Sequence, residues 1–238
     1  MELNILYEDN HLIAVFKPAG LLTQGDRTGD QSIFALTKRY IKAKYHKPGN
    51  VYLGLIHRLD RPASGIIIFA KTSKAASRLS EQLRCSLITK KYLAAVEGKM
   101  GVGDKQVLIQ YLQKNEQKNI TRVSNISKPG YKKSILEYQV KTNAKIQQLK
   151  KSSPHLSSII SNSFSSVPKQ TNTTFLDIHL ITGRSHQIRA QLSSINHPII
   201  GDIKYGAATP LPNKNIALIA YELSFYHPIT KKQITISL

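Results

Sequence analysis

The sequence has no tryptophan and only one cysteine, Cys85, among its 238 residues. A single cysteine excludes an internal disulfide and a cysteine-rich zinc site, and it fits a reducing compartment. No apolar run approaches the roughly 18–20 residues that a membrane-spanning helix needs. The opening stretch, MELNILYEDNHLIAVF, has no basic segment followed by an apolar one, so it does not predict a signal peptide. We therefore expect a cytoplasmic protein without a membrane partner.

Acidic residues are also scarce. Lysine and arginine together number 34 against 14 acids, which gives a formal net charge of +20. Such an excess attracts polyanions and accelerates their capture. The lysines are spread along the chain instead of lining one amphipathic helix, which disfavours a membrane surface. Nucleic acid is the leading partner class, and a basic protein that binds none is the plain alternative.

Signatures of metal and cofactor sites are missing. The eight histidines form no His-Glu-x-x-His pattern and no close pair with a nearby carboxylate. Gly101-Val-Gly103 lacks the third glycine of a dinucleotide-binding loop. A phosphate-binding loop and a serine-hydrolase elbow are absent too. We therefore expect neither a metal nor a cofactor.

Hydrophobic periodicity predicts an α+β fold around a largely antiparallel sheet, flanked by helices and loops. We expect strands at 4–7, 12–17, 65–70, 90–97, 174–181, 216–226 and 232–237, and several more within 104–140. Helices are expected at 31–45, from Thr72 or Ser73 to about Cys85, and over SHQIRAQLSSI after Gly183. The second helix should bury Ala76, Leu79 and Leu83.

The segment 141–173 differs in composition from the rest of the chain. It is rich in serine, lysine and asparagine. We interpret it as a flexible insertion that forms a solvated loop, with RNA contact as the second possibility.

The stretch IHRLDRPASGIII, residues 56–68, places one carboxylate, Asp60, between Arg58 and Arg61. The two arginines favour the ionised carboxylate through Coulomb attraction. An ionised carboxylate at the start of an apolar strand can serve as a nucleophile or a base. A salt-bridged aspartate that orders a turn explains the same pattern.

A second basic stretch, TGRSHQIR, covers residues 182–189. On a helix, His186 and Arg189 would share a face. Arg184 and Ser185 would lie at the helix N-terminus, where backbone N–H groups favour anions. A solvated basic helix face is the alternative. The following stretch, from His197 to Gly206, taken alone predicts only a turn-rich connection.

These motifs together resemble the RluA-type RNA pseudouridine synthases. HRLD-x-x-x-SG is similar to the catalytic motif of that family, and TKKYLAAVEG, residues 89–98, is similar to its second motif. TGRSHQIRAQLSSINHPIIGDIKYG, residues 182–206, resembles the third. The opening YEDNHLIAVFKPAGLLT and the closing IALIAYELSFYHPIT also resemble family segments. The likeness spans nearly the whole chain outside 141–173.

The resemblance implies a pseudouridine synthase-type fold with a cleft across the sheet and an RNA-modifying isomerase without cofactors. Asp60 would be the essential carboxylate, Tyr92 would pack on the target base, and Arg189 would pair with Asp60. The residues expected to bind RNA are Arg58, Arg61, Arg184, His186 and Gln187. The substrate would be ribosomal or transfer RNA, and we expect a monomer.

The sequence departs from the family pattern in a few places. Ser185 replaces a usual threonine, and Gln191 replaces a usual histidine. The family opening begins near residue 5, which leaves no room for the N-terminal RNA-binding module that members often carry. We therefore expect one catalytic domain over 1–238.

Two rival functions follow from the same residues. A non-catalytic RNA-binding protein on this fold would keep the charge without the catalytic residues. The second rival is an N-glycoside hydrolase or a nuclease, and glycoside hydrolysis usually needs two opposed carboxylates. Only Asp177 and Asp202 are candidates for the second one.

Overall fold

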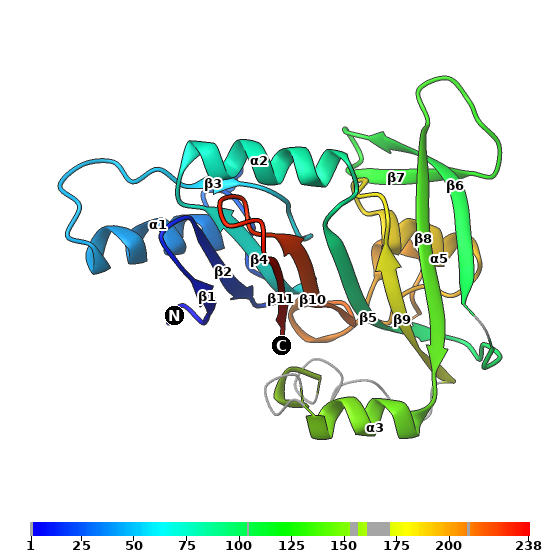
Figure 1. Cartoon of the computed structure of the whole chain (residues 1–238). Coiled ribbons are helices and arrows are strands. Elements are labelled where there is room, and N and C mark those ends of the chain that lie inside the picture. Colours follow the sequence, from blue (N-terminus) through cyan, green and yellow to red (C-terminus); the bar gives the residue numbers. More distant parts are fainter. Residues whose placement is uncertain (1, 104, 153–156, 161–171, 209) are drawn as a thin grey trace. The chain divides into compact units, whose positions relative to one another are not determined.

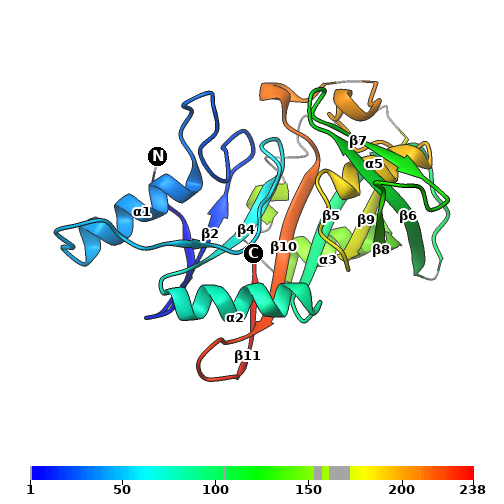
Figure 2. The same ribbon diagram turned by 90° about the horizontal axis from the view of Figure 1, so that it is seen from above.

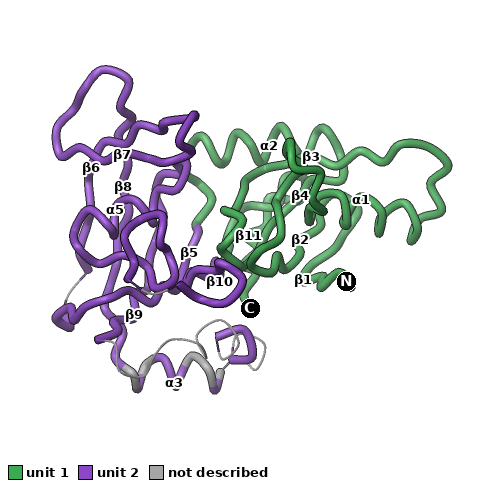
Figure 3. The backbone as a smooth tube through the Cα atoms, turned by 180° about the vertical axis from the view of Figure 1, so that it is seen from behind, with its two compact units in different colours: residues 1–89, 222–238 green, residues 90–221 purple. Residues whose placement is uncertain are grey.

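A computed structural model describes residues 2–103, 105–152, 157–160, 172–208 and 210–238. The chain divides into two compact units (Figure 3), residues 1–89 with 222–238 and residues 90–221. Each unit is built on antiparallel strand pairs with accompanying helices, which confirms the α+β prediction (Figure 1). The predicted cleft across the sheet stays a prediction.

The elements of the first unit are β1 (Ile5–Glu8), β2 (Leu12–Lys17), α1 (Ile33–Lys44), β3 (Gly54–Leu55), β4 (Ser64–Ala70), α2 (Ser73–Arg84) and β11 (Gln233–Ser237). Those of the second unit are β6 (Gln106–Asn115), β7 (Ile120–Ser124), β8 (Lys132–Lys141), α3 (Asn143–Ser152), β9 (Thr173–Leu180), α5 (Gln187–Ser194) and the 3-10 turns η1 (Ile203–Tyr205) and η2 (Pro212–Lys214). Nearly all of β5 (Thr89–Glu97) belongs to the second unit, and β10 (Leu218–Tyr226) runs from the second unit into the first.

In the first unit, β2 pairs antiparallel with β1 and β4. Every residue of β4 is buried, as its continuous run of β-branched residues predicts. The side chains of Ser32 and Thr72 accept hydrogen bonds from the first turns of α1 and α2 and start these helices. α2 packs against β4 and β3 (Figure 1).

The buried face of α2 differs from the prediction. Ala75, Leu79 and Gln82 are buried, whereas Ala76 and Leu83 are only half-buried. The Gln82 amide donates to the carbonyl of Tyr226 at 2.7 Å and accepts from its N–H at 2.9 Å. These two bonds compensate the burial of a polar side chain.

In the second unit, the strand order is β5-β9-β8-β6-β7, and all neighbours are antiparallel. Leu176, Ile178 and Leu180 of β9 are 0%, 0% and 7% exposed, which confirms the predicted alternation. α5 packs against β6 and β7 (Figure 2).

The expectation of a solvated loop over 141–173 is wrong for part of that segment. Residues 143–152 form helix α3, whose Ile146 is 3% exposed. A helix that buries an apolar side chain gains stability from tertiary packing beyond its local propensity. Most of the remaining segment lies outside the described residues, so its flexibility stays a prediction.

None of the helices in the described part of the chain is both long enough and apolar enough to cross a membrane.

The N-cap of α2 gives a direct test of this local structure. Thr72→Ala removes the hydroxyl that accepts from the Ala75 N–H at 3.2 Å. We expect a loss of about 1 kcal/mol in the free energy of unfolding, measured by denaturant titration. Thr72→Ser keeps the acceptor and should retain most of the stability. Equal values for Thr72→Ala and the wild type would contradict the cap.

Candidate active site

The predicted site residues are distributed over both units. Arg58, Asp60 and Arg61 lie in the first unit, in the loop that leads into β4. The second unit holds Tyr92, Arg184, His186, Gln187 and Arg189.

The backbone before Asp60 is fixed by a threonine hydroxyl. Thr23 Oγ1 donates to the Leu59 carbonyl at 2.7 Å and accepts from the Leu59 N–H at 3.2 Å. Thr23 and Leu59 are both buried. After Asp60, a turn closes when the Ala63 N–H donates to the Asp60 carbonyl at 3.1 Å. The half-buried Asp60 side chain therefore starts from a constrained backbone.

A buried lysine holds the other side of this loop. Lys17 is 0% exposed, and its Nζ donates to the carbonyls of Pro18, Leu21 and Arg61 at 3.0, 2.9 and 3.2 Å. Burial lowers the pKa of Lys17 to about 7, and the negative charge of Asp60 opposes that shift. Sequence reasoning missed both Lys17 and Thr23, because neither stands out from its neighbours by type.

The two arginines beside Asp60 have different surroundings. Arg61 forms an exposed ion pair with Asp30 at 2.8 Å, and its Nε donates to the Gly20 carbonyl at 3.0 Å. Arg61 therefore helps to hold the loop. Arg58 is exposed, and no hydrogen bond or ion pair joins it to another residue that the structure describes.

The predicted helix at TGRSHQIR is confirmed as α5, but it begins at Gln187. His186 takes a left-handed conformation, with φ of 52°, and so precedes the helix instead of lying on its face. His186 and Arg189 nevertheless converge on Tyr205. His186 Nδ1 lies 2.8 Å from the Tyr205 hydroxyl, and the Arg189 guanidinium lies 4.9 Å from the centre of the Tyr205 ring.

Arg189 is held by a buried bidentate ion pair. Its Nε and Nη2 donate to the two carboxylate oxygens of Asp202 at 2.7 and 2.8 Å. Arg189 is 5% and Asp202 is 1% exposed, so the alternative of a solvated basic helix face is wrong. The stretch 197–206 also proves to be more than a turn, since it supplies Asp202 and Tyr205. Within the second unit, Arg189 pairs with the carboxylate of Asp202. The expected pairing of Arg189 with Asp60 stays a prediction.

Gln187 has a structural role. It is 2% exposed, and its Oε1 accepts from the Thr182 hydroxyl at 2.8 Å and the Arg184 N–H at 3.0 Å. Its Nε2 donates to Gln191 Oε1 at 2.9 Å. These bonds hold the side chain in place, and the expected contact of Gln187 with RNA stays a prediction. Arg184 is exposed, and its Nε donates to the Lys133 carbonyl at 3.4 Å.

Tyr92 lies on β5 opposite Ile178 of β9 and is 5% exposed. This degree of burial does not distinguish a tyrosine of the core from a tyrosine that stacks on a base. Its role therefore stays a prediction.

Residues that could bind a metal ion are dispersed in the part of the chain that the structure describes, where no three His, Cys, Asp or Glu side chains gather. Two histidines have structural contacts instead. His57 Nε2 accepts from the Ile68 N–H at 3.3 Å, and His227 Nε2 lies 2.9 Å from Asp9 Oδ2.

The ion pair of Arg189 predicts a large effect on stability. Asp202→Asn leaves a buried guanidinium without its carboxylate, so we expect the free energy of unfolding to fall by about 3 kcal/mol or more in denaturant titration. The double variant Arg189→Met with Asp202→Asn removes both charges and should recover part of the loss. A change within about 0.5 kcal/mol, typical of surface positions, would contradict the pair.

Comparisons with known proteins were consistent with one another. The family model described as RNA pseudouridylate synthase matches residues 11–194. "Ribosomal large subunit pseudouridine synthase C" of Buchnera aphidicola subsp. Baizongia pistaciae is 33% identical over 98% of this chain, which spans 65% of that protein. "tRNA pseudouridine synthase C" of Pasteurella multocida is 33% identical over 99% of this chain and 90% of that protein.

The solved structures agree on the fold. "Human RNA Pseudouridylate Synthase Domain Containing 4" gives a TM-score of 0.70 at 19% identity, over 99% of this chain and 87% of that one. "Human RNA Pseudouridylate Synthase Domain Containing 1" gives 0.68 at 18% identity, over 100% and 83%. With the family model matching most of the sequence, the chain belongs to the RNA pseudouridylate synthases of the RluA type, a family of isomerases that act on RNA.

Proposed function

We propose that this chain converts uridine in ribosomal or transfer RNA to pseudouridine, with Asp60 as the essential carboxylate. The observation that carries the proposal is the position of Asp60. It lies in the HRLD-x-x-x-SG motif, between two residues whose backbone is fixed by Thr23 and Lys17. The relatives are named for ribosomal large subunit and tRNA substrates, which supports these two classes of RNA.

The reaction breaks the N1–C1′ glycosidic bond, turns the uracil and joins C5 to C1′. The proton lost from C5 balances the one gained at N1, so the product is an isomer and no oxidant or energy source is consumed. The Asp60 carboxylate would either attack C1′ or remove the proton at the 2′ carbon. Both routes use the carboxylate directly, as a nucleophile in the first and as a base in the second.

The remaining site residues have distinct proposed roles. Tyr92 would pack on the target base through its ring. Arg189 would contribute a fixed positive charge, held by Asp202 and Tyr205. Arg58 is exposed and would fill the gap that a flipped uridine leaves in the helix. Arg61, Arg184 and His186 would contact the RNA backbone.

The hydrolase alternative is not supported by the second unit. Asp202 is 1% exposed and already pairs with Arg189. Asp177 accepts from the Tyr221 hydroxyl at 2.9 Å and pairs with Lys141 at 3.0 Å. Both carboxylates thus have structural partners. We further propose that the enzyme acts as a monomer in the cytoplasm, for which the exposed, unpaired Cys85 is suited.

The role of Asp60 is tested with transcripts of ribosomal and transfer RNA that carry tritium at C5 of uridine. Wild type should release tritium to water from at least one of them, and Asp60→Asn should release none. Glu81→Gln, which changes an exposed carboxylate of α2 paired with Arg84, serves as the control and should remain active. Equal release by wild type and Asp60→Asn would show that another carboxylate carries the reaction.

Thr23 predicts a loss in rate without a loss in binding. Thr23→Val keeps the shape of the side chain and removes both hydrogen bonds to Leu59. Misplacing Asp60 by a fraction of an ångström should lower kcat by about 10- to 100-fold, with KM little changed. Thr23→Ser restores the hydroxyl and should rescue kcat. Unaltered kcat in Thr23→Val would rule out this positioning role.

A further inference from the structure

Lys90 is a buried amine that the proposed mechanism does not use. It lies on β5, two residues before Tyr92, so both side chains project from the same face of the strand. Lys90 is 7% exposed. Throughout the described ranges, no hydrogen bond or ion pair joins its Nζ to another residue.

The amine lies beside the turn of the third motif. A Cβ added to Gly183 would be 3.4 Å from Lys90 Nζ and, apart from the two flanking residues, would meet no other described heavy atom within 4 Å. Gly183 precedes Arg184, whose N–H is held by Gln187. The Lys90 amine therefore adjoins open space between a motif strand and a motif turn.

The Lys90 side chain is buried while its Nζ keeps some contact with solvent, so part of the hydration of this cation is lost without an ion pair to compensate it. Burial lowers the pKa of Lys90 to about 8, so the amine is still mostly protonated at pH 7. A protein that keeps such a charge without a counterion has a site prepared for an anion that arrives later. In an enzyme that acts on RNA, the abundant anion is the backbone phosphate.

We propose that Lys90 and the open space at Gly183 form a phosphate-binding subsite, which holds the RNA backbone next to the target uridine. The ammonium group is a compact point charge of the kind that binds phosphate. The inference rests on the proposed function for the identity of the RNA as substrate. In this proposal, Lys90 contacts a backbone phosphate and Tyr92 contacts the target base.

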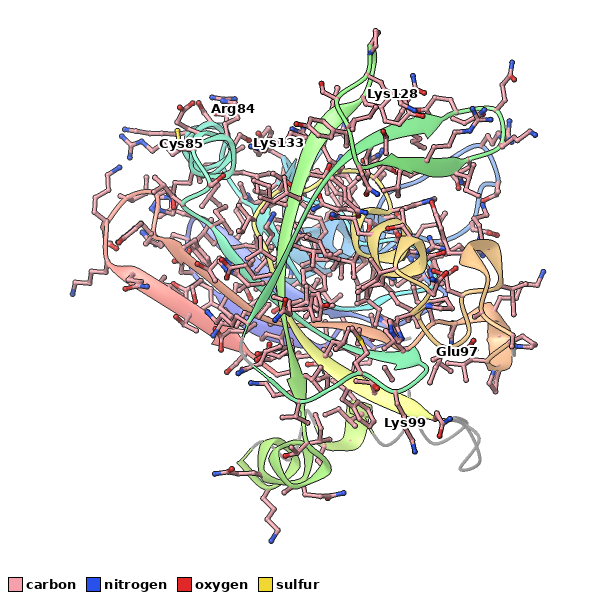
Figure 4. The ribbon with its side chains drawn as sticks, turned by 90° about the vertical axis from the view of Figure 1, so that its right-hand side faces the viewer. Arg84, Cys85, Glu97, Lys99, Lys128 and Lys133 are labelled. Atoms are coloured by element: carbon pink, nitrogen blue, oxygen red, sulfur yellow. The ribbon has the colours of Figure 1, made fainter. Side chains whose placement is uncertain are left out.

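The test compares Lys90→Met with Lys90→Arg and with the matched control Lys99→Met. Lys99 is exposed in the same unit and is labelled in Figure 4. The probe is single-stranded oligouridylate, for which no base pair has to be opened. Its Kd is measured by fluorescence anisotropy over a range of NaCl concentrations.

Loss of one phosphate contact should reduce the slope of log Kd against log salt by about 0.7 in Lys90→Met. Lys90→Arg should keep the slope. An unchanged slope in Lys90→Met, or the same reduction in Lys99→Met, would overturn the subsite.

Stability supplies a second measurement. At pH 7, Lys90→Met should be at least as stable as wild type in denaturant titration, because it removes an unpaired charge. The pKa of Lys90 is lower in the folded chain than in the unfolded chain, so wild type should gain stability as pH rises from about 8 towards 10.5. Lys90→Met lacks this gain. A marked loss of stability at pH 7 would instead indicate a structural lysine and contradict the proposal.

The failure of this proposal and that of the isomerase proposal can be told apart. The slope and the stability are measured without turnover, and tritium release by wild type is measured in parallel. A reduced slope without tritium release would retain the phosphate subsite and reject the isomerase. Tritium release with an unchanged slope would support the isomerase and reject the phosphate subsite.

Discussion

Buried positive charge is the constraint on which the candidate site depends. Burying a cation removes its hydration. Unless polar groups of the protein replace the lost water, the free energy of desolvation destabilises the folded state. Lys17 is satisfied by three backbone carbonyls, and Arg189 is satisfied by the carboxylate of Asp202. Lys90 has no such partner within the residues that the structure describes. The first two cations organise the loops of the site, and the third is suited to an incoming anion.

The position of Asp60 is set mainly by contacts that fix the backbone of its loop. The loop leads into β4, which is buried at every residue and therefore provides a rigid base. Thr23 fixes the residue before Asp60, and Lys17 contacts the residue after it. A carboxylate held in this way needs little reorganisation before it reacts, which is the main advantage of a preorganised site.

The sequence predicted the elements better than it predicted the contacts. β4 was predictable from its continuous run of β-branched residues, and β9 was predictable from its alternation of apolar and polar residues. The pairing of Arg189 with Asp202 could not be predicted. Asp202 lies in a stretch whose sequence indicates only a turn-rich connection between elements. Helix α3 was missed because a serine- and lysine-rich composition suggests a loop, whereas the burial of Ile146 depends on tertiary packing.

Lys128 and Lys133 are among the exposed lysines (Figure 4), and under the proposed function such lysines would attract the RNA backbone. The central claim, that Asp60 isomerises uridine in RNA, is tested most directly by mapping its product. Purified protein is incubated with unmodified ribosomal and transfer RNA transcripts, and pseudouridine is located by carbodiimide labelling and reverse-transcription stops. New stops at a few defined uridines with wild type, absent with Asp60→Asn, are the predicted result. No new stop in any transcript, with RNA binding intact, would contradict the account.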